Sequence, residues 1–451
     1  MRFLATAVAA SLALSGAWLG AVEARSVSGD RVLVLVPKVE AATLYSQFLA
    51  SLSSRGFAIS VRAATNTSVA LLVDGVRAYD HAVVLSPESK KLGANLSVRD
   101  FVSFVDDGGN LIVAASSELS ELSRKLAARF GVEYEKRGTA AIDHVAHLRA
   151  TNDTSDHTLV AAIPSRTAAP VLSKHLDHAR HSPVYFKGIA HKYESNNPML
   201  MPVLTGSRTT YSAAIGANAN EGTSSVAPLS GKAVGLVSVF QTRNNARVAF
   251  SGSTALFSDA LLGHEGGANK QFTTDISQWV LQEKAVLRET AHRHYLASTG
   301  ERPEHYRISN DIVYEVDLSV YHDNAWHPYR AKDVQFEAIM LDPYIRTTLN
   351  RTESASSETT ATYHGDIKLP DRYGTFTFRV NYKRTGYSNV DVKDTVGIWP
   401  LRHDEYPRFL SAAYPYYIGS LVMAVGFLAL CVVWLWSAEP KTKRAVKQKS
   451  S

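Results

Sequence analysis

An uncharged segment near the C-terminus, residues 418–436, constrains this 451-residue chain more than any other feature. A helix of that length rises about 28 Å, close to the thickness of the hydrocarbon core of a bilayer. Tyrosines precede the segment, and Trp434 and Trp436 end it, as expected where aromatic rings lie at two membrane–water interfaces. The sequence therefore predicts a transmembrane helix over 414–437, preceded by a stalk over 401–413. A buried core helix is the alternative, and it fits poorly beside a basic tail.

The two ends of the chain indicate how it is oriented in the membrane. Residues 438–451 are basic, which favours the cytosolic side. At the other end, Arg2 precedes an apolar run, and Val22 and Ala24 offer small residues at the positions that signal peptidase reads. We therefore expect a signal peptide over 1–24 and a single-pass type I membrane protein. An uncleaved N-terminal anchor is the alternative.

Charge and cysteine content exclude several classes of function. The formal net charge is +6, but residues 437–451 hold five basic residues and one acidic residue. The part of the chain outside the membrane is therefore nearly neutral, and nucleic acid is not an implied partner. The single cysteine, Cys431, lies inside the predicted span. Outside the membrane there is thus no thiol for a disulfide, for nucleophilic catalysis or for zinc.

The residues after the signal alternate between short apolar strands and amphipathic helices. This alternation predicts an α/β, doubly wound domain of the flavodoxin or amidotransferase type over 25–137, and a second α/β region over 138–290 packed on it. The expected strands are 31–36, 57–61, 82–85, 111–115, 139–143, 184–189, 234–240 and 247–251, and the expected helices are 43–55, 98–105, 118–130 and 272–287.

The pattern changes after residue 305. Apolar and polar residues then alternate along short segments separated by turn signals such as Arg384-Thr385-Gly386. Strands at this spacing without helices predict a β-sandwich over 305–400. Residues 291–304 are expected to be a linker.

Ser116 is the strongest candidate for a catalytic nucleophile. It follows a predicted strand and precedes a predicted helix, where hydrolases and amidotransferases of similar layout place their nucleophile. The glycines of a nucleophile elbow are absent, so a serine that caps the following helix is the other interpretation.

Histidines give no clear catalytic or metal site. In the adjacent pairs Asp80-His81 and Asp143-His144, neighbouring side chains on a strand point to opposite faces, which favours structural roles. His175, His178 and His181 would be spread over roughly 200° around a helix rather than gathered on one face. The sequence therefore predicts no catalytic residue, no cofactor-binding residue and no metal ligand in this chain.

Three sets of residues are candidate sites of another kind. The first are acceptor asparagines in N-x-[ST] sequons, at Asn66, Asn95, Asn152 and Asn350. The second are small residues in the predicted span that allow close helix packing, Gly419, Ala424, Gly426 and Ala429. The third are Lys447 and Lys449, which resemble a dilysine retrieval signal of endoplasmic reticulum membrane proteins.

Several segments form a recognisable set in this order: 79–87, 104–117, 141–144, 243–253, 342–347, 369–374 and 412–417. Together they resemble the non-catalytic 48-kilodalton subunit family of oligosaccharyltransferase, over nearly the whole mature chain. Two departures occur, at 92–95, where Gly-Gly-Asn is expected in this family, and over 206–231, which matches poorly.

The resemblance implies a place in the endoplasmic reticulum membrane with most of the chain in the lumen. The complex of this family transfers a preassembled oligosaccharide from dolichyl diphosphate to Asn in Asn-X-Ser/Thr of nascent proteins. The family also implies that a different, multi-spanning subunit performs the chemistry, while this chain supports assembly and holds no cofactor. The alternatives are a membrane-tethered hydrolase or amidotransferase-like enzyme that uses Ser116, and a cell-surface adhesion protein.

Overall fold

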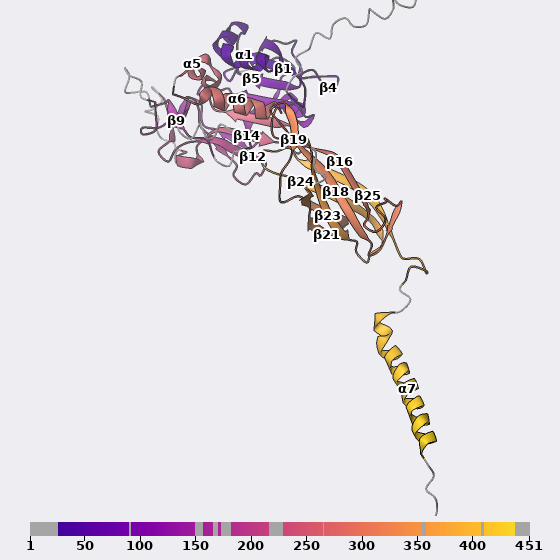
Figure 1. The fold of residues 1–451 in the computed structure, drawn as a ribbon. Helices are drawn as coiled ribbons and strands as arrows, with labels where there is room; N and C mark the ends of the chain where they lie inside the picture. The colour runs from indigo at the N-terminus through magenta and orange to yellow at the C-terminus, as the bar shows by residue number, and fades with distance from the viewer. Residues whose placement is uncertain are drawn as a thin grey trace, which may run out of the picture.

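The structure is a computed structural model, shown in Figure 1. It describes residues 26–89, 92–148, 157–165, 170–172, 182–215, 229–264, 266–352, 358–406 and 410–437. The predicted signal peptide and cytosolic tail, the sequon at Asn152 and the histidines at 175, 178 and 181 lie outside the described residues.

The first domain is built on a nine-stranded mixed sheet. Its parallel part has the order β2-β1-β5-β6-β15, with β1 (Arg31–Val36), β2 (Ala58–Ala63), β5 (His81–Val84), β6 (Asn110–Ala114) and β15 (Arg247–Ser251). The sheet continues antiparallel through β14 (Gly235–Gln241), β11 (His191–Tyr193) and β7 (Val132–Tyr134), and β12 (Leu200–Thr205) also pairs with β14. Three short ribbons pair β3 (Leu72–Val73) with β4 (Val76–Arg77), β8 (Thr139–Ile142) with β13 (Tyr211–Ala214), and β9 (Val160–Ala162) with β10 (Val184–Phe186).

Helices cover both faces of this sheet, because its central strands are apolar on both sides. Along β1, alternate residues enter different cores: Val32, Val34 and Val36 pack with one helical layer, and Leu33 and Leu35 pack with the other. The first layer contains η1 (Val39–Tyr45), α1 (Ser46–Ser54), η5 (Ala255–Phe257), α5 (Asp259–Leu262) and α6 (Asn269–Val280), and the second contains α2 (Val98–Asp106) and α3 (Glu121–Ala128). The predicted mixture of sheet and helix in this domain is confirmed.

The sequence analysis expected residues 138–290 to be a second α/β region packed on the first. In the structure they are not a separate region. Instead, β15 pairs in parallel with β6, with Val248 opposite Leu111, so both regions build one sheet. Without a neighbour, this edge of β6 would expose unpaired backbone groups, and the apolar strand β15 forms hydrogen bonds with them. The expected helix over 272–287 also ends early, at Val280, and a strand begins at Val286.

The second domain is a sandwich of two five-stranded sheets, so a sheet-rich second domain is confirmed. One sheet contains β16 (Val286–Leu296), β18 (Asp311–His322), β19 (Ala325–Pro328), β22 (Asn350–Thr352) and β23 (Ala361–Lys368). The other contains β17 (His305–Arg307), β20 (Gln335–Met340), β21 (Asp342–Thr348), β24 (Gly374–Tyr382) and β25 (Val390–Trp399). Aromatic side chains such as Tyr314, Phe336 and Phe376 are fully buried between the sheets.

The first six residues of the expected linker over 291–304 are strand, since β16 runs from Val286 to Leu296 and pairs with β18 along its length. The sandwich therefore begins about 20 residues earlier than predicted. Its sequence misled the prediction because β16 is an edge strand with charged residues on its exposed side, a composition that edge strands tolerate.

A long helix, α7 (Tyr414–Trp436), follows the short η6 (Ser411–Ala413) at the C-terminal end of the described chain (Figure 1). Within the segment Ser411–Trp436, an 18-residue stretch has a mean hydropathy of 2.5 and none of that stretch is buried, so the helix is long and apolar enough to cross a membrane. Among the described residues it is the one helix that meets both conditions.

Candidate functional site

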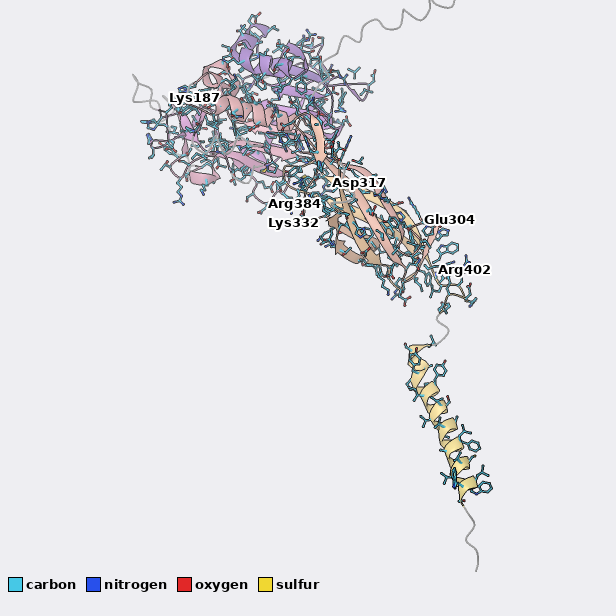
Figure 2. The ribbon with its side chains drawn as sticks, viewed as in Figure 1. Lys187, Glu304, Asp317, Lys332, Arg384 and Arg402 are labelled. Carbon is cyan, nitrogen blue, oxygen red and sulfur yellow. The ribbon has the colours of Figure 1, made fainter. Side chains whose placement is uncertain are left out.

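The loop that joins β24 to β25, residues 383–389, reaches out of the sandwich and docks on the first domain. Figure 2 places Arg384 at the end of the sandwich that adjoins this domain, and Arg402 at the opposite end. Hydrogen bonds from the first domain to the loop backbone fix this arrangement: Trp279 Nε1 to Gly386 O (2.7 Å), Gln241 Nε2 to Tyr387 O (2.7 Å) and Asn245 Nδ2 to Asn389 O (3.0 Å).

Gly386 is held where a side chain does not fit. Its φ of +85° lies in the left-handed region, and an added Cβ would lie 2.7 Å from Cβ of Pro170. The bare backbone at this position lets its carbonyl oxygen approach the indole of the buried Trp279. The loop is therefore shaped for contact between the domains.

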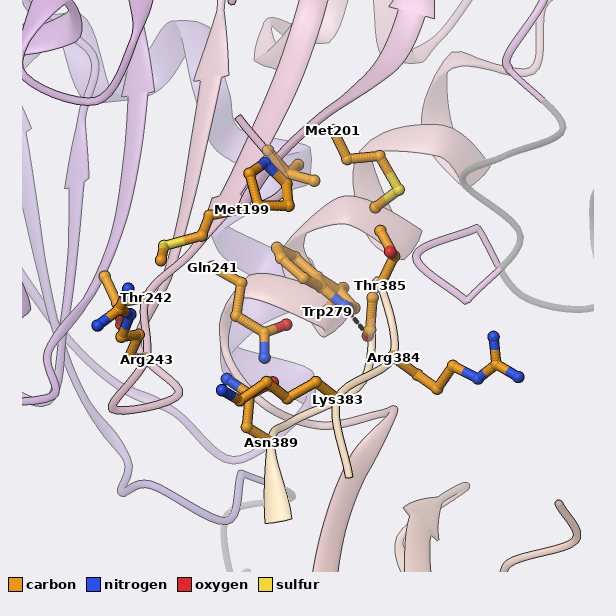
Figure 3. A pocket seen from close by; sticks show the side chains of 13 residues that line it. Met199, Met201, Gln241, Thr242, Arg243, Trp279, Lys383, Arg384, Thr385 and Asn389 are labelled. Carbon is orange, nitrogen blue, oxygen red and sulfur yellow. Dashed lines mark hydrogen bonds between the residues drawn. The ribbon is translucent and has the colours of Figure 1, made fainter. Parts of the chain in front are cut away.

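A pocket of about 310 Å³ opens beside this loop (Figure 3). The first domain contributes apolar side chains, chiefly Met199, Met201, Val239 and Trp279. The remaining lining residues are Pro198, Gln241, Thr242, Arg243, Lys383, Arg384, Thr385, Gly386 and Asn389. None of these lining residues carries a carboxylate, an imidazole or a thiol. The pocket can bind a group, but its side chains include neither a nucleophile with a base nor an acid/base pair.

Gln241 shows how the pocket uses its polar groups. Its Nε2 donates to the loop, which fixes the orientation of the side-chain amide. Its Oε1 is buried and accepts no hydrogen bond from the described residues. This arrangement leaves one acceptor at the junction.

Arg247, at the start of β15, lies fully buried behind the junction. Its guanidinium donates to three backbone carbonyls, those of Trp279 (2.8 Å), Lys284 (2.8 Å) and Ala285 (2.7 Å). It also lies 4.7 Å from the ring of Trp279, in a cation–π arrangement. Burial lowers the pKa of Arg247 to about 9. One side chain thus holds both the end of α6 and the entry into the sandwich.

Two buried ion pairs hold residues 281–285, the segment between α6 and β16 through which the chain passes from the first domain into the sandwich. We call this segment the crossing. Arg55 pairs with Glu283, and Lys284 pairs with Asp275 (2.9 Å). Burial lowers the pKa of Lys284, and the charge of Asp275 opposes that effect. Because each charge has a partner, the desolvation cost of burying it is partly offset. The crossing is therefore fixed by charges as well as by packing.

The predicted candidate Ser116 lies at the carboxyl end of β6 and is half-buried. Its Oγ accepts from the backbone N–H of Glu118 in a tight turn (3.3 Å), and no described histidine is hydrogen-bonded to it. The interpretation of Ser116 as the helix cap was wrong, because α3 begins at Glu121 and Ser120 is its N-cap. This arrangement provides no base for a nucleophile.

Asp80 precedes β5, His81 is its first residue, and the two side chains have different hydrogen-bond partners. Asp80 binds Arg31 through both carboxylate oxygens (3.0 and 2.9 Å). The buried His81 contacts the carbonyl of Gly29 through Nε2 (3.0 Å) and the amide of Asn110 through Nδ1 (3.2 Å). Both side chains are occupied in structural contacts.

Asp143 and His144 also have different hydrogen-bond partners. The Asp143 carboxylate accepts from two backbone amides and from the hydroxyls of Ser207, Thr209 and Thr210. These hydrogen bonds hold the pKa of Asp143 well below its usual range, against the opposing effect of desolvation. His144 instead contacts the hydroxyl of Tyr211 (2.8 Å).

The structure describes three of the four sequons and all four small residues of the span. Asn95 and Asn350 are exposed, whereas Asn66 is half-buried and its Oδ1 accepts from the backbone and hydroxyl of Ser68. On the regular helix α7, Gly419 and Gly426 lie on nearly the same face, while Ala424 lies about 140° away at roughly 100° per residue. Ala429 lies about 80° from Gly419, on the side of Gly426. The four residues therefore do not form a single stripe.

The junction itself was missed by the sequence analysis, although its parts were noticed. The cluster Arg384-Thr385-Gly386 was interpreted as a turn signal, and the structure brings it together with Arg243 at one pocket. A usable signal was Arg247, a charged residue that opens the apolar strand RVAFS. A buried arginine at such a position needs several acceptors, and these come from distant parts of the chain.

Comparisons with known proteins give consistent results along the chain. Residues 23–283 match the family model described as "OST48, N-terminal domain", and residues 294–438 match "OST48 middle domain". Three similar proteins are each named the 48 kDa subunit of dolichyl-diphosphooligosaccharide–protein glycosyltransferase. The one from Arabidopsis thaliana is 34% identical over 90% of this chain and 92% of its own length. Those from Danio rerio and Caenorhabditis elegans are 33% and 35% identical, over 92% of this chain and 94% and 93% of their own lengths.

Proposed function

Because the chain belongs to the family of the 48 kDa subunit of dolichyl-diphosphooligosaccharide–protein glycosyltransferase, we propose that it serves in this complex as a non-catalytic assembly subunit. In this role it supports the transfer of a preassembled oligosaccharide from dolichyl diphosphate to Asn-X-Ser/Thr of nascent proteins. The partners are the other subunits, including a multi-spanning catalytic subunit, together with the lipid bilayer. The chain itself contributes no cofactor.

One observation carries the non-catalytic role. The pocket at the junction is lined by apolar, amide, hydroxyl and cationic groups, without an acid/base pair. The acids and histidines suggested by the sequence that the structure describes are engaged with guanidinium, backbone, amide and hydroxyl groups. Two domains joined by hydrogen bonds from Trp279, Gln241 and Asn245 to the 383–389 loop suit a rigid scaffold that presents surfaces to other subunits.

The order of the parallel strands supports a more specific fold for the first domain. Read along the chain, β1, β2, β5, β6 and β15 lie in the order 2-1-3-4-5, which is that of flavodoxin-like doubly wound sheets. We assign the domain to this layout, with an antiparallel extension through β14, β11 and β7.

Depleting the chain from cells should cause underglycosylation of secreted proteins, and restoring it should reverse the defect. The Ser116→Ala variant should restore glycosylation as fully as the unchanged chain, because no described residue is hydrogen-bonded to Ser116 as a base. The measurement is the fraction of fully glycosylated reporter protein on gels after metabolic labelling. Normal glycosylation after depletion would refute the assembly role, and a Ser116→Ala variant that fails while still accumulating would favour the hydrolase alternative.

The sequons test the orientation, with the sandwich in the lumen and the tail, with Lys447 and Lys449, in the cytosol. The exposed Asn350 should carry a glycan that endoglycosidase H removes, and Asn350→Gln should abolish that mobility shift. We expect Asn66 to be glycosylated less, since its amide is folded against Ser68. A chain with no endoglycosidase-sensitive shift at Asn350 or Asn95 would count against a lumenal ectodomain, and resistant glycans would point to the cell surface.

A further inference from the structure

Four large apolar side chains are exposed together at the end of the sandwich opposite the domain junction. Leu341 is 99% exposed, Tyr373 70%, Trp399 49% and Tyr344 47%. We call these four residues the aromatic end. Folded domains rarely expose aromatic side chains in a group without a use for them.

The strand register shows that the aromatic end is one surface. Gly374 pairs with Ile398, so the neighbouring Tyr373 and Trp399 leave the sheet at the same edge. The turn that holds Leu341 reaches this edge too, because a Cβ added at Gly374 would lie 2.9 Å from Sδ of Met340. The remaining member lies close by, with the Tyr344 ring 5.6 Å from that of Phe376 on the same sheet.

The aromatic end lies close to α7 along the sequence. After β25 it stays against the sandwich, where Arg307 donates to the carbonyl of Pro400 (3.0 Å) and pairs with Glu405 (3.3 Å). Only five residues, 406–410, separate Glu405 from the apolar segment that begins at Ser411. Five extended residues span at most about 18 Å. Figure 1 shows the same order, with the sandwich between the first domain and α7.

The chemistry of the surface suits one occupant. Tryptophan and tyrosine prefer the membrane–water interface, where the ring is half apolar and half wet, and Tyr414 and Tyr416 at the start of α7 occupy that level if α7 spans. The exposed carboxylates of Asp342 and Asp371 adjoin the aromatic end and oppose deep insertion.

We propose that the aromatic end lies in the headgroup region of the non-cytosolic leaflet, so that the sandwich stands on the bilayer beside its own anchor. Leu341 and Tyr373 then reach the level of the upper acyl chains, while the neighbouring aspartates stay in water. This contact would give the two lumenal domains a second point of attachment to the bilayer besides α7. The proposal rests on α7 crossing the bilayer, but not on any property of the catalytic subunit.

Spin labels on the full-length chain in phosphatidylcholine vesicles test this contact. Leu341→Cys and Tyr373→Cys are each made in a Cys431→Ala background, and the accessibility of each label to oxygen and to a neutral nickel chelate is measured by power saturation. Oxygen concentrates in the bilayer and the nickel chelate in water, which is present on both sides. The matched control is Val76→Cys, an apolar residue that is 70% exposed on the β3–β4 ribbon of the first domain.

The oxygen-to-nickel ratio at positions 341 and 373 should exceed that at 76 severalfold. Equal ratios at the three positions would overturn the proposal, since the aromatic end would then lie in water. Labels shielded from both reagents would overturn it as well, in favour of a protein occupant such as a second copy. A label on the native Cys431 reports on the span separately: exposure of that label to nickel would refute the anchor itself, and with it the proposed membrane topology.

Discussion

Lowering the pH from 7.5 to 5 should reduce the free energy of unfolding of the first domain by about 4 kcal/mol, through two buried histidines. Burial lowers the pKa of His81 to about 4 and that of His191 to about 3. In the unfolded chain both would titrate near 6.5. Between about pH 6.5 and 4, the two histidines therefore bind protons in the unfolded state but not in the folded state. The free energy of unfolding falls as the pH drops below about 6.5. Each histidine costs about 2 kcal/mol at pH 5, from about 1.4 kcal/mol per pH unit.

The surroundings of the two rings explain why they stay neutral. His81 lies between the carbonyl of Gly29 and the amide of Asn110, with the charge of Asp80 opposing its desolvation only in part. His191 contacts the hydroxyl of Ser238 (2.8 Å), and its other ring nitrogen is buried without a partner among the described residues. Among the described residues, neither ring is hydrogen-bonded to a carboxylate that could stabilise the imidazolium.

Urea unfolding at pH 7.5 and pH 5 measures this loss of unfolding free energy. Native-state hydrogen exchange of the backbone amides in β1 and β11 measures it in the first domain. The double variant His81→Asn/His191→Asn should be less stable at pH 7.5 but should lose less than about 1 kcal/mol on going to pH 5. Replacing the exposed His327 by Gln should leave the pH dependence of the unchanged chain as it is. A double variant with an unchanged pH dependence would show that other groups, and not these two rings, take up the protons.

Replacing Arg247 by methionine should destabilise the first domain by roughly 3–5 kcal/mol. Methionine matches much of the apolar stem, but the carbonyls of Trp279, Lys284 and Ala285 would lose their donor in a buried place. The cation–π contact with Trp279 would also be lost. Because these carbonyls lie at the crossing between the domains, the sandwich should become mobile relative to the first domain.

The control is Arg243→Met, four residues earlier, because Arg243 is exposed and lines the pocket without a described ion pair. It should change the stability by less than about 0.5 kcal/mol. Urea unfolding reports the stability, and limited proteolysis near residues 282–286 reports the opening of the crossing. If Arg247→Met were as stable as Arg243→Met, the guanidinium would not be what holds the segment that enters the sandwich.

Local patterns in the sequence determined much of this protein. The apolar run RVLVLV predicted β1 as a strand buried on both faces, and the alternation after residue 305 predicted the sandwich. The uncharged run before Trp436 predicted α7, and the ordered set of short segments predicted the family that the comparisons show. These features depend on neighbouring residues, and a periodicity of two or of 3.6 can be counted along the chain.

Only the tertiary structure decided how distant segments meet. The sequence did not reveal that β15 would complete the edge of β6, more than 130 residues earlier, or that β16 would be a strand rather than a linker. It could not show that Arg247 would find its acceptors at residues 279, 284 and 285, nor that the 383–389 loop would form a pocket with Gln241. Strand pairing and buried hydrogen bonds depend on which backbone groups folding brings close together. Local sequence patterns do not indicate which groups those are.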